Sequence, residues 1–266
     1  MRSSRSLPRT RWGPEGAGEG ARELPEEAPV ALMHDAATTA VMMATPADLE
    51  DFGVGFSLTE GVIEGADEIT GLEIAPADLG VEVRMWLRQP AGAALAARRR
   101  RLAGPTGCGL CGIESLAEAV RAPKVVGEGV RFTPEAIRAA LRTLGPAQAL
   151  GAATRAAHAA AWWTDEGGLI AVREDVGRHN ALDKLVGAMA RGKVAAEDGI
   201  LLLTSRVSVE MVQKASVLGA QILVAISAPT TLAVRTAEAA GMTLVAVARD
   251  DGFEIFTRPD RVLSAP

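Results

Sequence analysis

The stretch LIAVREDVGRHNALDK, residues 169–184, decides the fold class of this chain. It begins with an apolar run, passes through a polar loop that contains Gly177, and continues into a helical pattern. A strand that leads through a short polar loop into a helix is the repeating unit of α/β proteins. The unlike polar groups crowded into residues 173–184 predict that this loop forms part of a ligand site.

The same unit recurs through the C-terminal half of the chain. The further apolar runs occupy residues 200–203, 222–226 and 243–247. Repeated strand-loop-helix units indicate a largely parallel sheet with helices on both faces. The turn signal at residues 250–252 predicts that a last strand, residues 253–257, returns antiparallel at one edge. We therefore predict an α/β fold built on a mixed sheet.

Polar residues follow each of the first three predicted strands. They are Glu174, Asp175, Gly177, Arg178, His179 and Asn180 after the first strand, Thr204, Ser205 and Arg206 after the second, and Ser227, Thr230 and Thr231 after the third. Ligands of open α/β sheets bind beyond the carboxyl ends of the strands, where helix N-termini present free N–H groups. These loops are thus expected to bind an anionic ligand with several oxygens, such as a nucleotide diphosphate.

The side chains of these loops suggest individual roles. Arg178 and Arg206 suit bidentate binding of phosphate oxygens, and Gly177 lets the backbone approach the ligand closely. The carboxylate of Asp175 is expected to accept hydrogen bonds from a purine edge.

A purely structural interpretation of the first loop is the alternative. In it Glu174 pairs with Arg178, and Asp183 and Lys184 lie on a solvated helix face. In either case we expect Asn180 to cap a helix over residues 181–189.

The N-terminal part differs in composition. Residues 1–28 are rich in Arg, Gly, Pro and Glu with few large apolar side chains, which predicts a tail without fixed structure. Residues 29–104 are predicted to form a small α+β lobe and a linker that carries the basic run 98–101. In the lobe, Thr45 and Pro46 are expected to open a helix as cap and first helical residue. Residues 105–266 then form the main domain.

Composition narrows the class of protein. The chain has 266 residues, 48% of them hydrophobic, which is enough for a substantial core. A formal net charge of -5 argues against sequence-independent binding to nucleic acid. No apolar stretch approaches the ~20 residues of a membrane helix. The first residues also lack the apolar region of a signal peptide, so we expect a cytoplasmic protein with no membrane partner.

The two cysteines, Cys108 and Cys111, lie in the glycine-rich stretch GCGLCG, residues 107–112. The loop between them is too short to stabilise a fold as a disulfide, so they indicate reactivity or metal binding. A zinc half-site, a dithiol redox couple, and a nucleophile with a resolving thiol all remain open. A zinc deaminase is disfavoured, because none of the histidines has Glu two residues later; they are His34, His158 and His179.

Glycine around the cysteines works against a rigid helix and suits a loop that reaches two different partners. A thiolate in such a loop can accept a sulfane sulfur from a donor persulfide and pass it to an acceptor while a second thiol assists release.

Five motifs in this order resemble those of the formate dehydrogenase accessory sulfur carrier family, FdhD. They are Cys108-x-x-Cys111, EDVGRH at 174–179 with DK at 183–184, SRVSVEMVQK at 205–214, SAPTTLAV at 227–234, and FTRPDR at 256–261. The resemblance covers about residue 31 to residue 262. One departure is Arg155-Ala156, where the family commonly has a glycine pair.

The resemblance implies a deaminase-like α/β core, a homodimer and a sulfur carrier. The sulfur would come as a persulfide from an L-cysteine desulfurase and go to the bis(molybdopterin guanine dinucleotide) cofactor before that cofactor enters formate dehydrogenase. Cys108 matches the family's persulfide cysteine and Cys111 its partner. The family's cofactor-binding segment matches Phe256, Thr257, Arg258, Pro259, Asp260 and Arg261, and GDP is expected to mimic the cofactor. The alternative is a guanine-nucleotide-binding module whose cysteines are regulatory or bind zinc.

Overall fold

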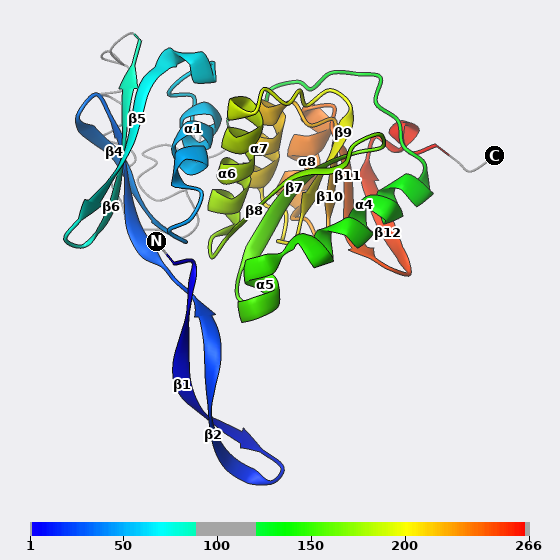
Figure 1. Ribbon diagram of the computed structural model, residues 1–266. Coiled ribbons are helices and arrows are strands. Elements are labelled where there is room, and N and C mark those ends of the chain that lie inside the picture. Colours follow the sequence, from blue (N-terminus) through cyan, green and yellow to red (C-terminus); the bar gives the residue numbers. More distant parts are fainter. Residues whose placement is uncertain (1, 89–120, 264–266) are drawn as a thin grey trace.

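The computed structural model describes residues 2–88 and 121–263 (Figure 1). A small N-terminal lobe consists of a four-stranded sheet and one main helix. Its elements are β3 (Ala28–His34), β4 (Ala37–Ala44), α1 (Leu49–Thr59), η1 (Ala66–Glu68), β5 (Ile69–Ala77) and β6 (Gly80–Leu87), with sheet order β4-β3-β6-β5. Alternate residues of β3 and β6 face α1 and pack on Phe52 and Phe56, which forms the lobe's own core.

The start of α1 differs from the sequence prediction. The helix begins at Leu49 behind Asp48, so Thr45 is not its cap and Pro46 is not its first residue. The backbone N–H of Thr45 donates to Asp175 Oδ2 at 2.9 Å, and its carbonyl oxygen accepts from Lys184 Nζ at 2.9 Å. The segment before α1 therefore joins the lobe to the main domain.

The main domain is built on a six-stranded mixed sheet, as predicted. The strands are β7 (His158–Thr164), β8 (Gly168–Asp175), β9 (Gly199–Leu203), β10 (Ile222–Ala225), β11 (Thr243–Arg249) and β12 (Gly252–Thr257), in the order β12-β11-β10-β9-β7-β8. β9, β10 and β11 are parallel, β12 returns antiparallel to β11, and β7 is antiparallel to both of its neighbours. Strands β8 to β11 consequently all end at one edge of the sheet, which we call the carboxyl edge; the opposite one is the amino edge.

Helices cover both faces of this sheet, which confirms the predicted α/β class. One face carries α6 (Arg178–Arg191), α7 (Val209–Leu218) and α8 (Thr231–Ala239), and the other carries α4 (Pro134–Ala147) and α5 (Ala149–Thr154). The even residues of β9, such as Leu202, pack toward α4, whereas the odd ones, such as Leu201, pack toward α6 and α7. Both faces of each central strand are apolar, as a doubly covered sheet requires.

The predicted N-terminal tail instead forms a hairpin over most of its length. β1 (Ser4–Gly13) and β2 (Gly16–Pro25) pair antiparallel in an unbroken register, and the ribbon extends away from the rest of the molecule (Figure 1). The low apolar content of these residues predicted a tail without fixed structure. That prediction is wrong because strand pairing uses backbone N–H and C=O groups, which composition does not reveal. At the other end of the described chain, the short helix η2 (Pro259–Arg261) follows β12.

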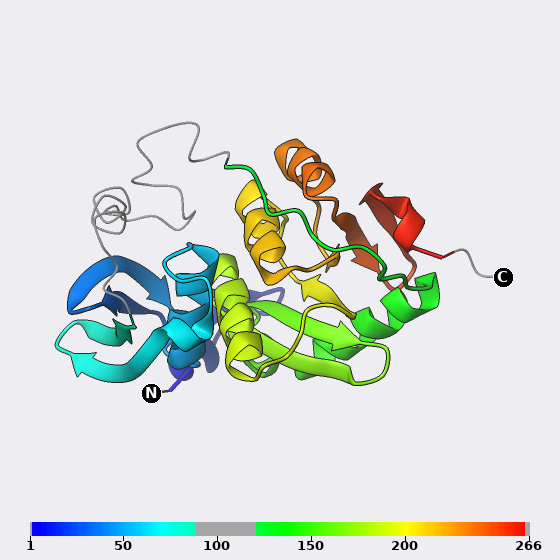
Figure 2. The ribbon, with the colours of Figure 1, turned by 90° about the horizontal axis from the view of Figure 1, so that it is seen from above.

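The lobe packs against the main domain through α1 and α6, which lie side by side in both views (Figures 1 and 2). Glycines allow this approach: a Cβ on Gly55 would lie 1.7 Å from the carbonyl oxygen of Asp183, and one on Gly187 would lie 1.9 Å from that of Asp51. The Asp51 carboxylate also pairs with Arg173 at 2.7 Å. The middle of α1 is thereby held beside α6, and its first turn is held beside β8.

Candidate functional site

The loops after β8, β9 and β10 meet at the carboxyl edge. His158, the first residue of β7, lies opposite Asp175, the last residue of β8. The Thr204 hydroxyl accepts from the backbone N–H of Ala159 at 2.8 Å, and the loops after β9 and β10 are joined by a bridge between Val207 and Pro229. The predicted side chains of these three loops are thus brought to one edge.

Asp175 does not face a ligand. It is fully buried and pairs with Lys184 Nζ at 2.6 Å. Its oxygens also accept from the backbone N–H groups of Thr45 and Gly177 and, at 3.0 Å, from the side-chain amide of Asn180. The predicted role of Asp175 as acceptor from a purine edge is therefore wrong, because all its bonding capacity is used inside the fold.

The roles predicted for Asn180 and the neighbouring charges also change. α6 begins at Arg178 behind Gly177, so Asn180 lies in its first turn and caps nothing; its amide also donates to the Met43 carbonyl at 2.8 Å. Asp183 and Lys184 are both buried, which excludes a solvated helix face.

Glu174 does not pair with Arg178. Its carboxylate accepts from the backbone N–H groups of Leu150 and Gly151 at 2.8 and 2.7 Å, in the first turn of α5. A carboxylate there satisfies donors that the helix itself cannot. This leaves the charge of Arg178 without that predicted partner.

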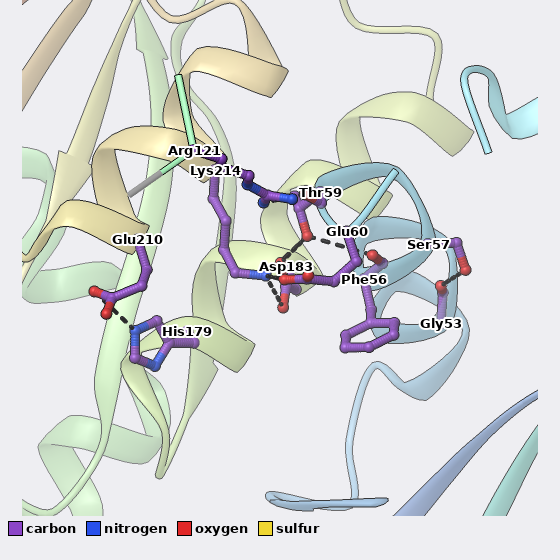
Figure 3. Close-up of polar contacts among 10 residues, drawn as sticks. All are labelled: Gly53, Phe56, Ser57, Thr59, Glu60, Arg121, His179, Asp183, Glu210 and Lys214. Atoms are coloured by element: carbon purple, nitrogen blue, oxygen red, sulfur yellow. Dashed lines mark hydrogen bonds and ion pairs between the residues drawn. The ribbon is translucent and has the colours of Figure 1, made fainter. Parts of the chain in front are cut away.

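A buried network joins α6 and α7 to the lobe (Figure 3). Lys214 Nζ contacts Asp183 Oδ1 at 2.8 Å and Glu60 Oε1 at 2.9 Å, and the Thr59 hydroxyl donates to Asp183 at 2.6 Å. Burial raises the pKa of Asp183, against the lowering effect of Lys214. Burial opposes the charge of Lys214, but Asp183 and Glu60 outweigh it and raise the Lys214 pKa. The charged groups of this network pair with one another, so the network has a structural role in joining the lobe to the main domain.

Beside this network lie four buried polar atoms with no hydrogen-bond partner, which we call the α6–α7 cluster. They are Arg178 Nε and His179 Nε2 at the start of α6, and Ser208 Oγ and Glu210 Oε2 at the start of α7. Within the described residues only one other buried side-chain atom, Trp162 Nε1, lacks a partner. Native proteins rarely leave such atoms unpaired, so their concentration at two helix N-termini marks a place for polar ligand atoms.

The two histidines near the cluster are held neutral. Burial, followed by the charges of Lys214 and Arg178, lowers the pKa of His179 to about 3. Burial and then Arg178 and Arg206 lower the pKa of His158. That both arginines act on His158 places their positive charge at the same edge.

The other predicted loop residues are structural or exposed. Ser205 Oγ donates to the Arg206 carbonyl at 3.0 Å, and the Thr230 hydroxyl caps α8 by accepting from the Ala233 N–H at 3.2 Å. The Ser227 carbonyl accepts from the Val247 N–H. Arg206 is exposed, and its guanidinium pairs with no residue in the described ranges. Sequence reasoning named Arg178 and His179 but missed Ser208 and Glu210, although both lie in the motif directly after the second predicted strand.

The closing segment 256–261 lies at the amino edge, away from the cluster. The Thr257 hydroxyl donates to the Met242 carbonyl at 2.6 Å, which is where β11 begins. Arg261 is 3% exposed and donates to the carbonyl oxygens of Gly127, Gln221 and Gly241. Within one chain the two predicted parts of the cofactor site are therefore not brought together, because β12 runs antiparallel to β11.

The same segment also has a surface-facing part. Phe256 is 38% exposed, and Arg258 pairs with Asp260 at 3.1 Å. Pro259 opens η2.

Cys108 and Cys111 lie outside the described residues, as do the basic run 98–101 and the predicted boundary near residue 104. The described chain resumes at Arg121, whose guanidinium donates to the Thr59 carbonyl and whose own carbonyl accepts from Gln213, each at 2.9 Å. Arg121 is thus held on α7, one helical turn from Glu210 (Figure 3).

Two searches concern the described ranges alone. Residues 2–88 and 121–263 contain no group of three or more His, Cys, Asp or Glu side chains that could hold a metal ion. No helix in those ranges has the length and apolar character needed to cross a membrane.

Comparison with known proteins gives one consistent family. The sequence profile of the FdhD/NarQ family matches residues 25–263. The chain is 51% identical over 262 residues to the sulfur carrier protein FdhD of Agrobacterium fabrum, covering 98% of this chain and 97% of that one. It is 53% identical over 251 residues to the protein of the same name from Brucella abortus, covering 94% and 93%. A crystal structure of a putative formate dehydrogenase accessory protein from Desulfotalea psychrophila aligns with a TM-score of 0.79 at 26% identity, over 98% of this chain and 100% of that one. The chain belongs to the FdhD/NarQ family.

Proposed function

We propose that this protein is a sulfur carrier that serves a formate dehydrogenase. It accepts sulfur as a persulfide on Cys108 from an L-cysteine desulfurase and transfers it to the bis(molybdopterin guanine dinucleotide) cofactor before that cofactor is inserted. Family membership and the names of close relatives support the carrier role. The observation that carries the ligand part is the α6–α7 cluster, where buried polar atoms remain unpaired.

The loading step needs no outside oxidant. The Cys108 thiolate attacks the outer sulfur of the donor persulfide, a new S–S bond forms, the donor S–S bond breaks, and the released donor thiolate takes up one proton. In the release step the Cys111 thiolate attacks the inner sulfur of the Cys108 persulfide. A Cys108–Cys111 disulfide forms, and sulfide leaves for the metal. A dithiol reductant then restores both thiols.

The carboxyl edge supplies the groups that an anionic dinucleotide needs. Arg178 and Arg206 bring positive charge, and the N-termini of α6 and α7 bring unpaired N–H groups and positive dipole ends. Arg121, the first described residue after the cysteines, is bonded to Gln213 of α7 and to Thr59 at the end of α1. We infer that the cofactor lies over the carboxyl edge while sulfur is delivered.

In this proposal the segment 256–261 takes part in cofactor binding within a homodimer. The cofactor carries two guanine dinucleotides and so needs more than one anion-binding surface. We infer that Phe256, Arg258 and Asp260 at the amino edge serve the cofactor together with a second subunit.

Intact mass spectrometry tests the carrier role. After incubation with desulfurase and cysteine, the protein should gain one sulfur atom, and Cys108→Ser should abolish the gain. Cys111→Ser is the matched control: it should load sulfur but release less of it. Stoichiometric zinc with no sulfur gain would contradict the carrier and favour a nucleotide-binding module with zinc-binding cysteines.

A further inference from the structure

The donors and acceptors of the α6–α7 cluster restrict what it can bind. The Nε of Arg178 can only donate, and an ionised Glu210 can only accept. Ser208 Oγ and the neutral imidazole of His179 can each do either. A ligand that pairs with all four atoms must therefore present both N–H or O–H donors and an acceptor.

Simple ions do not meet this requirement. An inorganic anion brings no donor for Glu210 and is repelled by its charge, whereas a cation is repelled by Arg178. A neutral ring edge with N–H donors beside a carbonyl oxygen meets it. The 2-amino-4-oxo-pyrimidine edge, which guanine and pterins share, has this pattern, and a carboxylate can accept from its ring N–H and its amino group together.

Among the carboxylates around the starts of α6 and α7, Glu210 is the one left over. Asp175 pairs with Lys184, and Glu174 accepts hydrogen bonds from the first turn of α5. Asp183 pairs with Lys214 and accepts a hydrogen bond from Thr59. Glu210 Oε2 lies 4.0 Å from His179 Nε2, too far for a direct hydrogen bond.

Glu210 also borders the surface. Its side chain is 12% exposed, against 7% for that of His179. Glutamate has three rotatable side-chain bonds, so its carboxylate can turn toward a ligand that approaches over α7 while His179 stays in place.

We propose that Glu210 recognises the 2-amino-4-oxo edge of the ligand, with His179, Ser208 and Arg178 bonding the polar atoms around that edge. Glu210 thereby takes the role that sequence reasoning gave to Asp175. This inference rests on the proposed function, because it names the residues that select the ring of the bound cofactor.

Calorimetry on the full-length protein tests the proposal with GDP, IDP and 6-hydroxymethylpterin as probes. IDP lacks the 2-amino group, so the wild type should bind GDP more tightly than IDP. Glu210→Gln should weaken GDP binding about 10- to 100-fold, the loss expected for hydrogen bonds to a charged group. IDP binding should change less, so the preference for GDP should shrink. Glu254→Gln, at an exposed position of β12, is the matched control and should change neither affinity.

The outcomes separate this inference from the proposed function. Loss of pterin binding with unchanged GDP binding in Glu210→Gln would support the same role with the pterin as the recognised ring. Unchanged affinities for both probes, in a variant that unfolds at the wild-type temperature, would overturn the proposal. If the wild type binds neither probe while Cys108 still loads sulfur, the ligand site at this edge is wrong and the carrier chemistry stands.

Discussion

Arg178 and Arg261 lie at opposite edges of the same sheet and use their donors differently. Arg261 is 3% exposed and donates to three backbone carbonyl oxygens, so its charge is part of the fold. Arg178 has a buried Nε with no acceptor, and its charge acts on the neighbouring His179. We therefore base the proposed ligand site on unused bonding capacity and not on the burial of a charge.

The first test measures how much a buried, fully paired charged group contributes to the stability of the fold. Lys184→Met should lower the free energy of unfolding by about 3–5 kcal/mol, because it leaves the buried Asp175 carboxylate without its cation. Chemical denaturation measures this. Lys124→Met, at an exposed position, should change stability by less than about 0.5 kcal/mol. Equal stability of the two variants would show that Asp175 is not a structural group.

The second test compares the two arginines directly. Arg261→Met should lower the free energy of unfolding by about 3 kcal/mol, because three carbonyl oxygens lose their donor. Arg178→Met should leave stability within about 0.5 kcal/mol and weaken GDP binding about 10- to 100-fold. If Arg178→Met unfolds as easily as Arg261→Met and binds GDP normally, the distinction between the edges fails.

The third test uses pH. Folding lowers the pKa of His179 from 6.5 to about 3. Below pH 6.5 the unfolded chain therefore binds a proton at this residue that the folded chain does not bind. Stability should fall as pH falls through this window, by up to about 1.4 kcal/mol per pH unit from this residue. In denaturation series between pH 7 and pH 4, His179→Leu should show a shallower fall than the wild type. Parallel curves would mean that His179 is accessible to protons in the fold.

The smallest expected effect concerns the backbone before His158. Arg155 follows α5 with φ 58°, a backbone conformation that favours glycine. Arg155→Gly should raise the free energy of unfolding by about 0.5 kcal/mol, after the larger entropy of the unfolded chain is allowed for. Ala152→Gly, inside α5, should lower it by about 0.5–1 kcal/mol. A loss of stability in Arg155→Gly would mean that the arginine side chain itself supports the edge.

Local patterns predicted much of this molecule. The apolar runs at 200–203 and 222–226 and the turn at 250–252 predicted the sheet and its antiparallel last strand. The loops that meet at the carboxyl edge follow from parallel strands, so Arg178 and His179 were named correctly as neighbours of that edge.

Long-range pairing could not be predicted in this way. Asp175 accepts a hydrogen bond from the backbone of Thr45, which lies 130 positions away in the sequence. Lys214 donates a hydrogen bond to Thr59, which lies 155 positions away. A motif shows that a carboxylate is present but not which distant donor reaches it. The segment 256–261 was grouped with the loops by chemistry, whereas the antiparallel return of β12 carries it to the other edge.

Hydrogen–deuterium exchange with and without GDP tests the central claim most directly. If the ligand lies over the N-termini of α6 and α7, bound GDP should slow exchange in residues 177–182 and 206–212. Slowing confined to residues 256–263, with the two helix starts unchanged, would contradict the account.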